Sequence, residues 1–131
     1  MSCEFVHLHL HTEYSMLDGA VRLDYIIGSN EDGKIHSYPL AEALKQDGQT
    51  AVAITDHGNL YGVYNFVNTL KNKGIKPIIG SEFYVAPNMY DKRPEVLRQR
   101  DHLILLAKSS VGYSNLMYLS SKSFIDGFYG K

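Results

Sequence analysis

The chain has 131 residues, of which 44% are hydrophobic and 21% are charged, so it can form one globular domain with a sizeable core. Thirteen basic and fourteen acidic residues give a formal net charge of −1, which excludes nucleic-acid binding through an overall basic surface. The single cysteine, Cys3, excludes an internal disulfide bond and favours the reducing cytoplasm. No apolar run approaches the ~20 residues needed to cross a bilayer, so we expect no membrane partner.

The first predicted element is a strand over residues 4–10, in which apolar residues alternate with histidines. Alternate side chains of a strand point to opposite faces, so one face carries the imidazoles of His7, His9 and His11. Residues on the same face lie roughly 6.6 Å apart, which lets two imidazoles bind one divalent metal ion. His7 lies one pleat deeper, and we expect it in the core or behind the ligands. The alternative is a histidine-rich strand whose rings bond to the core backbone.

Two helices are predicted around a loop. A short helix is expected over residues 21–27, and the turn-forming residues that follow predict a surface loop extension over about 28–38. This loop contains His36, which we expect to be exposed to solvent. The second helix covers residues 40–45, because Pro39 suits its first turn.

A strand and a helix follow as one unit. Residues 50–55 predict a buried strand, as a parallel sheet covered on both faces requires. A helix with Asn59 as its N-cap is predicted to run to about Lys73, because apolar residues recur with the helical period. Gly74 can close this helix in the left-handed conformation.

The C-terminal part adds further strands and a final helix. Residues 76–85 hold one or two predicted strands, residues 86–100 form an exposed loop, and residues 102–107 form another buried strand. A helix is predicted over residues 112–124. Its apolar residues on the helical period are assigned to the core, namely Tyr113, Leu116, Met117 and Leu119.

This alternation of strands and helices predicts an α/β fold with a parallel sheet. About four β-α units do not close a barrel, which takes about eight strands. We therefore expect residues 1–131 to be the first, incomplete part of a single longer domain. The strand over residues 102–107 would then have an open edge, through which the isolated chain could self-associate.

Side chains that suit a metal ion lie at the ends of the predicted strands, where α/β folds place their chemistry. His9 and His11 end the first strand, and Asp18 lies in the loop after it. His57 follows the second strand, Glu82 ends the third, and His102 opens the strand after it. Histidines and carboxylates without thiolates suit Zn, Mn or Fe. A carboxylate between two metal ions can bridge them, as two-metal hydrolytic sites require.

Each of these residues also has a structural alternative. Asp18 could belong to a turn, Glu82 could be an exposed strand end, and His102 could be a hydrogen-bonded core histidine. Asp56 could cap the next helix, or it could orient the ligands from behind them.

Two short motifs resemble the polymerase and histidinol phosphatase (PHP) family. They are His9-Leu10-His11-Thr12 with Ser15, and Thr55-Asp56-His57. Longer blocks are similar to the N-terminal PHP segments of bacterial replicative DNA polymerases, the DNA polymerase III alpha-subunit family. These blocks are residues 5–19, 54–62, 74–82 and 102–108, in this order along the chain.

The resemblance implies the first half of a distorted (β/α)7 barrel, with a trinuclear metal site at the C-terminal ends of its strands. By position, His9 and His11 would hold the first metal with Glu82 as the bridge, His102 the second, and Asp18 with His57 the third. Zn or Mn are the implied cofactors, with Fe or Mg as further candidates. The remaining ligands and the polymerase active site would lie beyond Lys131, so this chain is not expected to polymerise DNA.

The function implied by the resemblance is that of a metal-dependent phosphoesterase in DNA replication, with 3′–5′ proofreading exonuclease activity. The implied partners, through the full-length polymerase, are DNA, the sliding clamp and a separate proofreading subunit. Two alternatives stay open. The domain could be a structural platform without catalysis, or the chain could be a free-standing PHP phosphatase that acts on a metabolite such as histidinol phosphate.

Overall fold

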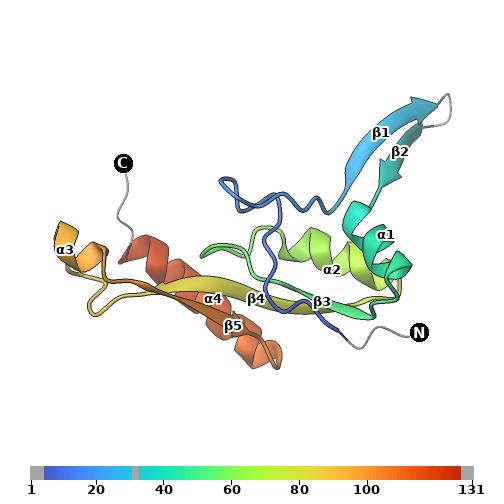
Figure 1. Ribbon diagram of the computed structural model, residues 1–131. Helices are drawn as coiled ribbons and strands as arrows, with labels where there is room; N and C mark the ends of the chain where they lie inside the picture. Colours follow the sequence, from blue (N-terminus) through green and yellow to red (C-terminus); the bar gives the residue numbers. More distant parts are fainter. Residues whose placement is uncertain (1–4, 31–32, 128–131) are drawn as a thin grey trace.

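The computed structural model describes residues 5–30 and 33–127 (Figure 1). The elements in chain order are β1 (Tyr25–Asn30), β2 (Gly33–Ser37), α1 (Pro39–Gln46), β3 (Ala51–Ile54), α2 (Val63–Asn72), β4 (Lys76–Val85), α3 (Pro94–Leu97), β5 (Asp101–Leu106) and α4 (Ser110–Ile125). They form a three-stranded sheet in the order β3-β4-β5 and a separate two-stranded sheet of β1 and β2. The mixed α/β character predicted from the sequence is confirmed.

The three-stranded sheet combines a parallel and an antiparallel pair. β3 and β4 are parallel, with Ala51 opposite Lys76, as expected of a β-α-β unit whose helix is α2. β5 is antiparallel to β4, with Tyr84 opposite His102, so the prediction of an all-parallel sheet is wrong here. The cause is the connection over residues 86–100. It contains only the four-residue helix α3 at the end of the sheet, so the chain turns back without a crossover (Figure 1).

The N-terminal segment, residues 5–10, runs alongside β3 without forming a regular strand. His7 makes a single parallel bridge to β3, and the backbone N–H of Thr55 donates to the carbonyl of Leu10 at 2.9 Å. The direction predicted for the first strand is therefore found, whereas a continuous strand is not.

α1, α2 and β3 supply most of the buried core. α1 covers Pro39–Gln46, one residue longer at each end than predicted, with Pro39 in its first turn as expected. α2 begins at Val63, later than an N-cap at Asn59 would place it. The side chain of Asn59 instead accepts a hydrogen bond from the backbone N–H of Tyr61 at 3.1 Å, which forms a turn before the helix. Gly74 has the predicted left-handed conformation, with φ of 72°. The core consists of Leu23, Leu40, Ala41, Leu44, Val52, Ile54, Val63, Phe66, Leu70 and Ile75.

β1 and β2 form an antiparallel hairpin that projects away from the three-stranded sheet (Figure 1). The hairpin replaces both the loop predicted over residues 28–38 and the end of the helix predicted over residues 21–27, so these predictions are wrong. The pairing satisfies backbone polar groups across the ladder, which a loop would leave to water. The side chain of His36 lies outside what the structure describes, so its exposure stays a prediction.

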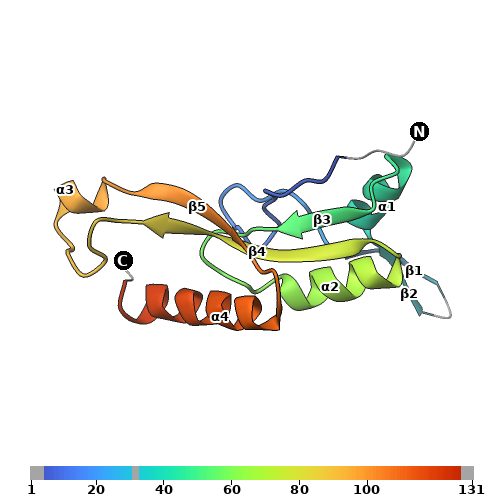
Figure 2. The same ribbon diagram turned by 90° about the horizontal axis from the view of Figure 1, so that it is seen from below.

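β5 and α4 are more exposed than the sequence predicts. Leu103 of β5 is exposed, and in α4 Leu116 is buried whereas Met117 and Leu119 are exposed. α2 and α4 follow one another along one face of the sheet (Figure 2), and α4 packs there against β4 with one side only. The core assignments for Met117 and Leu119 are therefore wrong. Self-association through the β5 edge stays a prediction. Among the described helices, none is both long and apolar enough to cross a bilayer.

Candidate metal centre

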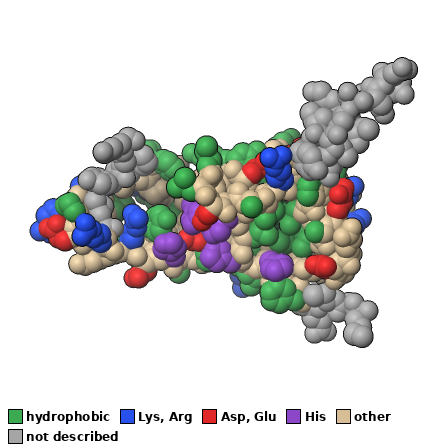
Figure 3. Space-filling view, turned by 45° about the horizontal axis from the view of Figure 1, so that its top comes forward, with side chains coloured by type: hydrophobic (Ala, Val, Ile, Leu, Met, Phe, Trp, Pro, Cys, Tyr) green, Lys and Arg blue, Asp and Glu red, His purple; other side chains and the backbone are tan. Residues whose placement is uncertain are grey.

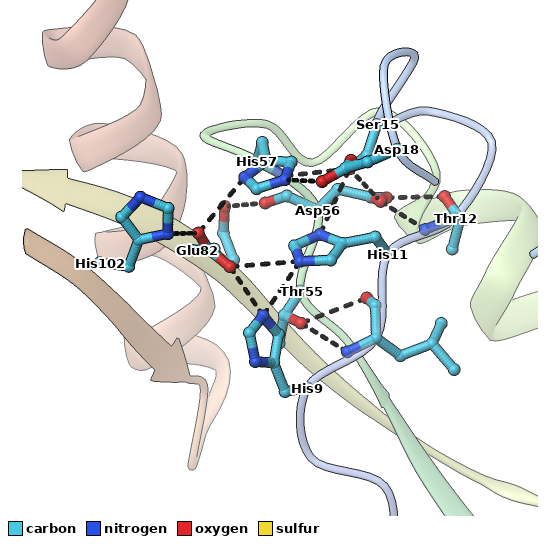
Figure 4. Close-up of polar contacts among 12 residues, drawn as sticks. His9, His11, Thr12, Ser15, Asp18, Thr55, Asp56, His57, Glu82 and His102 are labelled. Atoms are coloured by element: carbon cyan, nitrogen blue, oxygen red, sulfur yellow. Dashed lines mark hydrogen bonds and ion pairs between the residues drawn. The ribbon is translucent and has the colours of Figure 1, made fainter. Parts of the chain in front are cut away.

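The six residues that the sequence singles out as ligands lie close together. Figure 4 shows their side chains around the carboxylate of Glu82, and histidines gather on this face of the molecule in the space-filling view (Figure 3). They come from the N-terminal segment (His9, His11 and Asp18), the loop after β3 (His57), β4 (Glu82) and β5 (His102).

The strand register explains why these residues meet. Glu82 lies within β4 and not at its end, because β4 continues to Val85, past the end of β3. The loop after β3 runs along this extension, and His57 pairs with Glu82 in a parallel bridge. His102 reaches the same place because the antiparallel β5 begins beside the end of β4. The prediction that Glu82 ends its strand is therefore wrong, although its position beside the histidines is as expected.

One carboxylate oxygen of Glu82 faces the two histidines of the N-terminal segment. Oε2 lies 2.7 Å from Nε2 of His9 and 3.2 Å from Nε2 of His11. The two Nε2 atoms are themselves 3.0 Å apart. The ligand atoms of the three residues lie within 4.8 Å of one another, a spacing that a single metal ion can bridge.

The other oxygen of Glu82 faces the remaining two histidines. Nδ1 of His57 lies 3.3 Å from Oε1, and Nδ1 of His102 forms a closer ion pair with it. Within the described part of the chain, neither Oε1 of Glu82 nor Nδ1 of His57 has a hydrogen bond of good geometry, although both atoms are buried. Buried polar atoms are rarely left without a hydrogen bond. A cation between the lone pairs of Oε1 of Glu82 and Nδ1 of His57 would satisfy both atoms.

His57 also connects the cluster to Asp18. Nε2 of His57 lies 2.9 Å from Oδ2 of Asp18. The ring of His57 stacks on the ring of His11, with centroids 4.1 Å apart. The two nitrogens of His57 thus face two different carboxylates, those of Asp18 and Glu82.

Asp56 holds the chain segments that carry these ligands. Its buried carboxylate accepts hydrogen bonds from the backbone N–H and the hydroxyl of Thr12 and from the hydroxyl of Ser15, each at 2.7 Å. The Ser15 oxygen accepts in turn from the backbone N–H of His57 at 3.1 Å. Asp56 therefore fixes the N-terminal segment against the loop after β3. It lies behind the ligand side chains, as one of its two sequence interpretations proposes.

The surroundings shift several pKa values toward the forms that bind metal. Burial, helped by the neighbouring His57, lowers the pKa of His11. Burial acts to raise the pKa of Glu82, but the hydrogen bond from His9 and the nearby histidines outweigh it, so this pKa is lowered. The hydrogen bond from His57 lowers the pKa of Asp18. Neutral imidazole and ionised carboxylate are the states that metal ions require.

His7 lies apart from this cluster. Its exposed ring packs edge-on against Phe5, with centroids 4.7 Å apart, so the expectation that it lies deeper than His9 is wrong. The physical reason is that this segment is an irregular extended stretch at the edge of the described sheet, which leaves His7 in contact with solvent.

The structure adds one residue that the sequence analysis missed. The ring of Tyr84 lies 4.6 Å from that of His102 and 6.4 Å from that of His57, measured between centroids. The signal that could have found it is the strand period of two, because Tyr84 follows Glu82 by two positions in β4 and shares its face.

Comparison with known proteins gives two consistent results. The family model of the PHP domain matches residues 28–131. A DNA polymerase III subunit alpha of Campylobacter jejuni subsp. jejuni is 49% identical over 126 residues, which are 96% of this chain and 9% of the relative. The protein of that name from Treponema pallidum is 45% identical over 129 residues, 97% of this chain and 10% of the relative. The one from Aquifex aeolicus is 40% identical over an alignment of 138 positions, which covers 100% of this chain and 11% of the relative. The chain spans about a tenth of the length of these relatives.

Proposed function

The chain belongs to the PHP domain family, and we propose that the cluster centred on Glu82 binds divalent metal ions and hydrolyses phosphoesters. We propose further that the chain is the N-terminal PHP segment of a bacterial replicative DNA polymerase, in line with the names of its relatives. In that protein the cluster would act as a 3′–5′ exonuclease on DNA.

The observation that carries the proposal is the arrangement of nitrogen atoms around one buried carboxylate. Nε2 of His9 and Nε2 of His11 lie 3.0 Å apart, and both face Oε2 of Glu82. A shared proton could satisfy this pair of rings, but it would leave Nδ1 of His57 buried without a hydrogen bond of good geometry. A metal ion accepts the lone pairs of imidazole nitrogens and carboxylate oxygens alike, which supports metal ions over a proton at this carboxylate.

The donor set narrows the choice of metal. Imidazole nitrogens and carboxylate oxygens, without thiolates, suit Zn or Mn best, with Fe and Mg as further candidates. His9 and His11 would hold one ion and His102 another, with Glu82 between them. Asp18 and His57 would hold a third. When bound, such ions lower the pKa of water and neutralise charge on a phosphoryl group.

The chain's own residues provide the fixed frame for this chemistry. The two oxygens of Glu82 face different histidines, so its buried carboxylate would hold an ion on each side. Asp56 acts through Thr12 and Ser15, whose bonds hold the N-terminal segment against the loop after β3. Outer residues of this kind orient the ligands of metal sites and tune their affinity.

Partners follow from the same proposal. The relatives are named as subunits of a DNA polymerase, which implies assembly with other replicase subunits. We propose the sliding clamp and a separate proofreading subunit as partners of the full-length protein, and DNA as its substrate.

The test is an exonuclease assay with a single-stranded oligonucleotide labelled at its 5′ end, with Mn²⁺ or Zn²⁺ added. The expected result is stepwise shortening from the 3′ end, slowed at least about 100-fold by His11→Ala. His7→Ala is the matched control, because His7 belongs to the same segment but lies outside the cluster, and it should leave the rate unchanged. Metal binding without any hydrolysis would contradict the catalytic role and favour a structural platform.

A further inference from the structure

A cavity lies beside the candidate metal centre, lined by residues of β4, of the connection over residues 86–100 that contains α3, and of the C-terminal end of α4. Figure 2 shows these elements at the same end of the molecule. Its volume is about 350 Å³. Ligand pockets in proteins range over roughly 300–1,000 Å³, so this cavity suits one small molecule or one residue of a polymer.

The cavity shares part of its wall with the metal centre. His57 and Tyr84 both line it. The Tyr84 ring contacts the ring of His102, and both His57 and His102 face Oε1 of Glu82. A ligand in the cavity therefore lies directly next to the proposed site of phosphoester cleavage.

The walls combine aromatic and apolar side chains with a few polar groups. The apolar part comes from Phe83, Tyr84, Met89, Val96 and Phe124. The guanidinium of Arg100 lies over the Tyr84 ring, 4.7 Å from its centroid. Asn88 and Asp91 add an amide and a carboxylate to the wall.

This chemistry fits a flat aromatic group with polar edges. Aromatic rings and the plane of an arginine stack on nucleobases, and amide and carboxylate groups can bond to base edges. A group with a long flexible apolar chain would fill the cavity without bonding to the Asn88 amide or stacking on the Arg100 guanidinium.

We propose that this cavity is a base-binding subsite, which takes the nucleobase of a nucleotide whose phosphate lies at the Glu82 centre. The inference rests on the proposed function and adds the part of the substrate that is recognised. The nucleotide can be free or can form the end of a single strand, because both present the same base and phosphate.

The first test fills the cavity. Ser123 lines it, whereas Ser121 lies on the exposed side of α4, and each hydroxyl donates to a backbone carbonyl of the helix. Ser123→Phe and Ser121→Phe are therefore matched variants. Binding of thymidine, thymidine 5′-monophosphate and a thymidine trinucleotide is measured by NMR titration. For each ligand that binds the unchanged chain, Ser123→Phe should lower the affinity by about 5- to 150-fold, the range of one lost base stack. Ser121→Phe should leave the affinity unchanged.

The second test removes the guanidinium group of Arg100 from the cavity wall. Arg100→Ala should weaken thymidine binding at least fivefold, whereas Arg98→Ala removes an exposed arginine that does not line the cavity and should change nothing. Unfolding of each variant by urea shows that the fold is kept. The proposal is overturned if Ser123→Phe and Ser121→Phe, or Arg100→Ala and Arg98→Ala, lower the ligand affinity equally.

Separate probes distinguish this inference from the proposed function. Thymidine without phosphate reports on the cavity alone, and inorganic phosphate with Zn²⁺ reports on the metal centre alone. Phosphate binding without thymidine binding overturns the base subsite and leaves the proposed function standing. Thymidine binding that is sensitive to Ser123→Phe supports the subsite even where phosphate fails to bind. Preference for the trinucleotide over the monophosphate identifies a strand end as the source of the base.

Discussion

Oε2 of Glu82 lies 2.7 Å from Nε2 of His9, although the Glu82 side chain is 2% exposed and the His9 side chain is 54% exposed. The negative charge of the site is thus held inside the fold, while one of its imidazoles opens to solvent. A metal ion at this place would be bound by a buried carboxylate and would still be accessible to a substrate from the solvent, as a hydrolytic centre requires.

Removing the charge of Glu82 should therefore weaken metal binding without changing the shape of the site. Glu82→Gln keeps the size of the side chain but places an amide among the histidine nitrogens. We expect the affinity for Zn²⁺ or Mn²⁺ to fall at least tenfold, measured by calorimetry. Glu95→Gln is the control, because that side chain is exposed on α3. An affinity that is equal in both variants would contradict the role given to Glu82.

Asp56 should matter for stability as well as for the site. In Asp56→Asn an NH₂ group replaces an oxygen that accepts from Thr12 or Ser15, so a buried hydrogen bond is lost. We expect a loss of about 1.5–3 kcal/mol in the free energy of unfolding by urea. Asp47→Asn, at an exposed position after α1, should change it by less than about 0.5 kcal/mol. Similar values for the two variants would show that the Asp56 bonds are not as the structure places them.

Gly19 should not tolerate a side chain. A Cβ atom there would lie 1.8 Å from the backbone oxygen of Thr12 and 2.9 Å from that of Ser15, so the loop that carries Asp18 must shift. We expect Gly19→Ala to cost about 1–3 kcal/mol in the free energy of unfolding. At Gly112 a Cβ would be 3.4 Å from its nearest neighbour, within α4, and Gly112→Ala should be neutral or stabilise by up to about 1 kcal/mol. The prediction fails if both variants unfold alike.

An ion pair near α3 gives a prediction on pH. Hydrogen bonds from Arg93 lower the pKa of Asp91 to about 2. Because the folded pKa lies below the unfolded value of about 3.9, this carboxylate contributes stability above pH ~3.9 and loses it as the pH falls toward 2. In Arg93→Ala, the pKa of Asp91 followed by NMR should rise toward its ordinary value. A pKa that stays near 2 in the variant would mean that another group causes the shift.

The meeting of His57, Glu82 and His102 could be predicted from the sequence, because the predicted strands bring these residues to the same end of neighbouring strands, even though Glu82 lies within β4 and not at its end. The sequence could not show which oxygen of Glu82 faces which histidine, since this depends on the extension of β4 past β3. The hydrogen bonds between Thr12 and Asp56 could not be predicted from the sequence either, because these residues are 44 positions apart.

The errors in the fold have local causes. Tyr25, Ile26 and Ile27 favour a strand by their shape, but they are too few to separate a strand period from a helical one. The direction of β5 depends on whether its connection crosses the sheet, and residues 86–100 show no pattern that decides this. His7 follows the same alternation as His9, yet the segment is irregular, so alternation alone misplaces it.

The most direct test of the metal centre is the metal content of three variants of the purified chain. Samples of His7→Ala, His9→Ala and His11→Ala are dialysed against a limiting concentration of Zn²⁺ and analysed for bound metal beside the unchanged chain. We predict that His7→Ala keeps the metal content of the unchanged chain, while His9→Ala and His11→Ala lose most of it, because of these three rings only those of His9 and His11 face Glu82. An unchanged chain that binds no metal, or a loss in His7→Ala as large as in the other two, would contradict the metal centre.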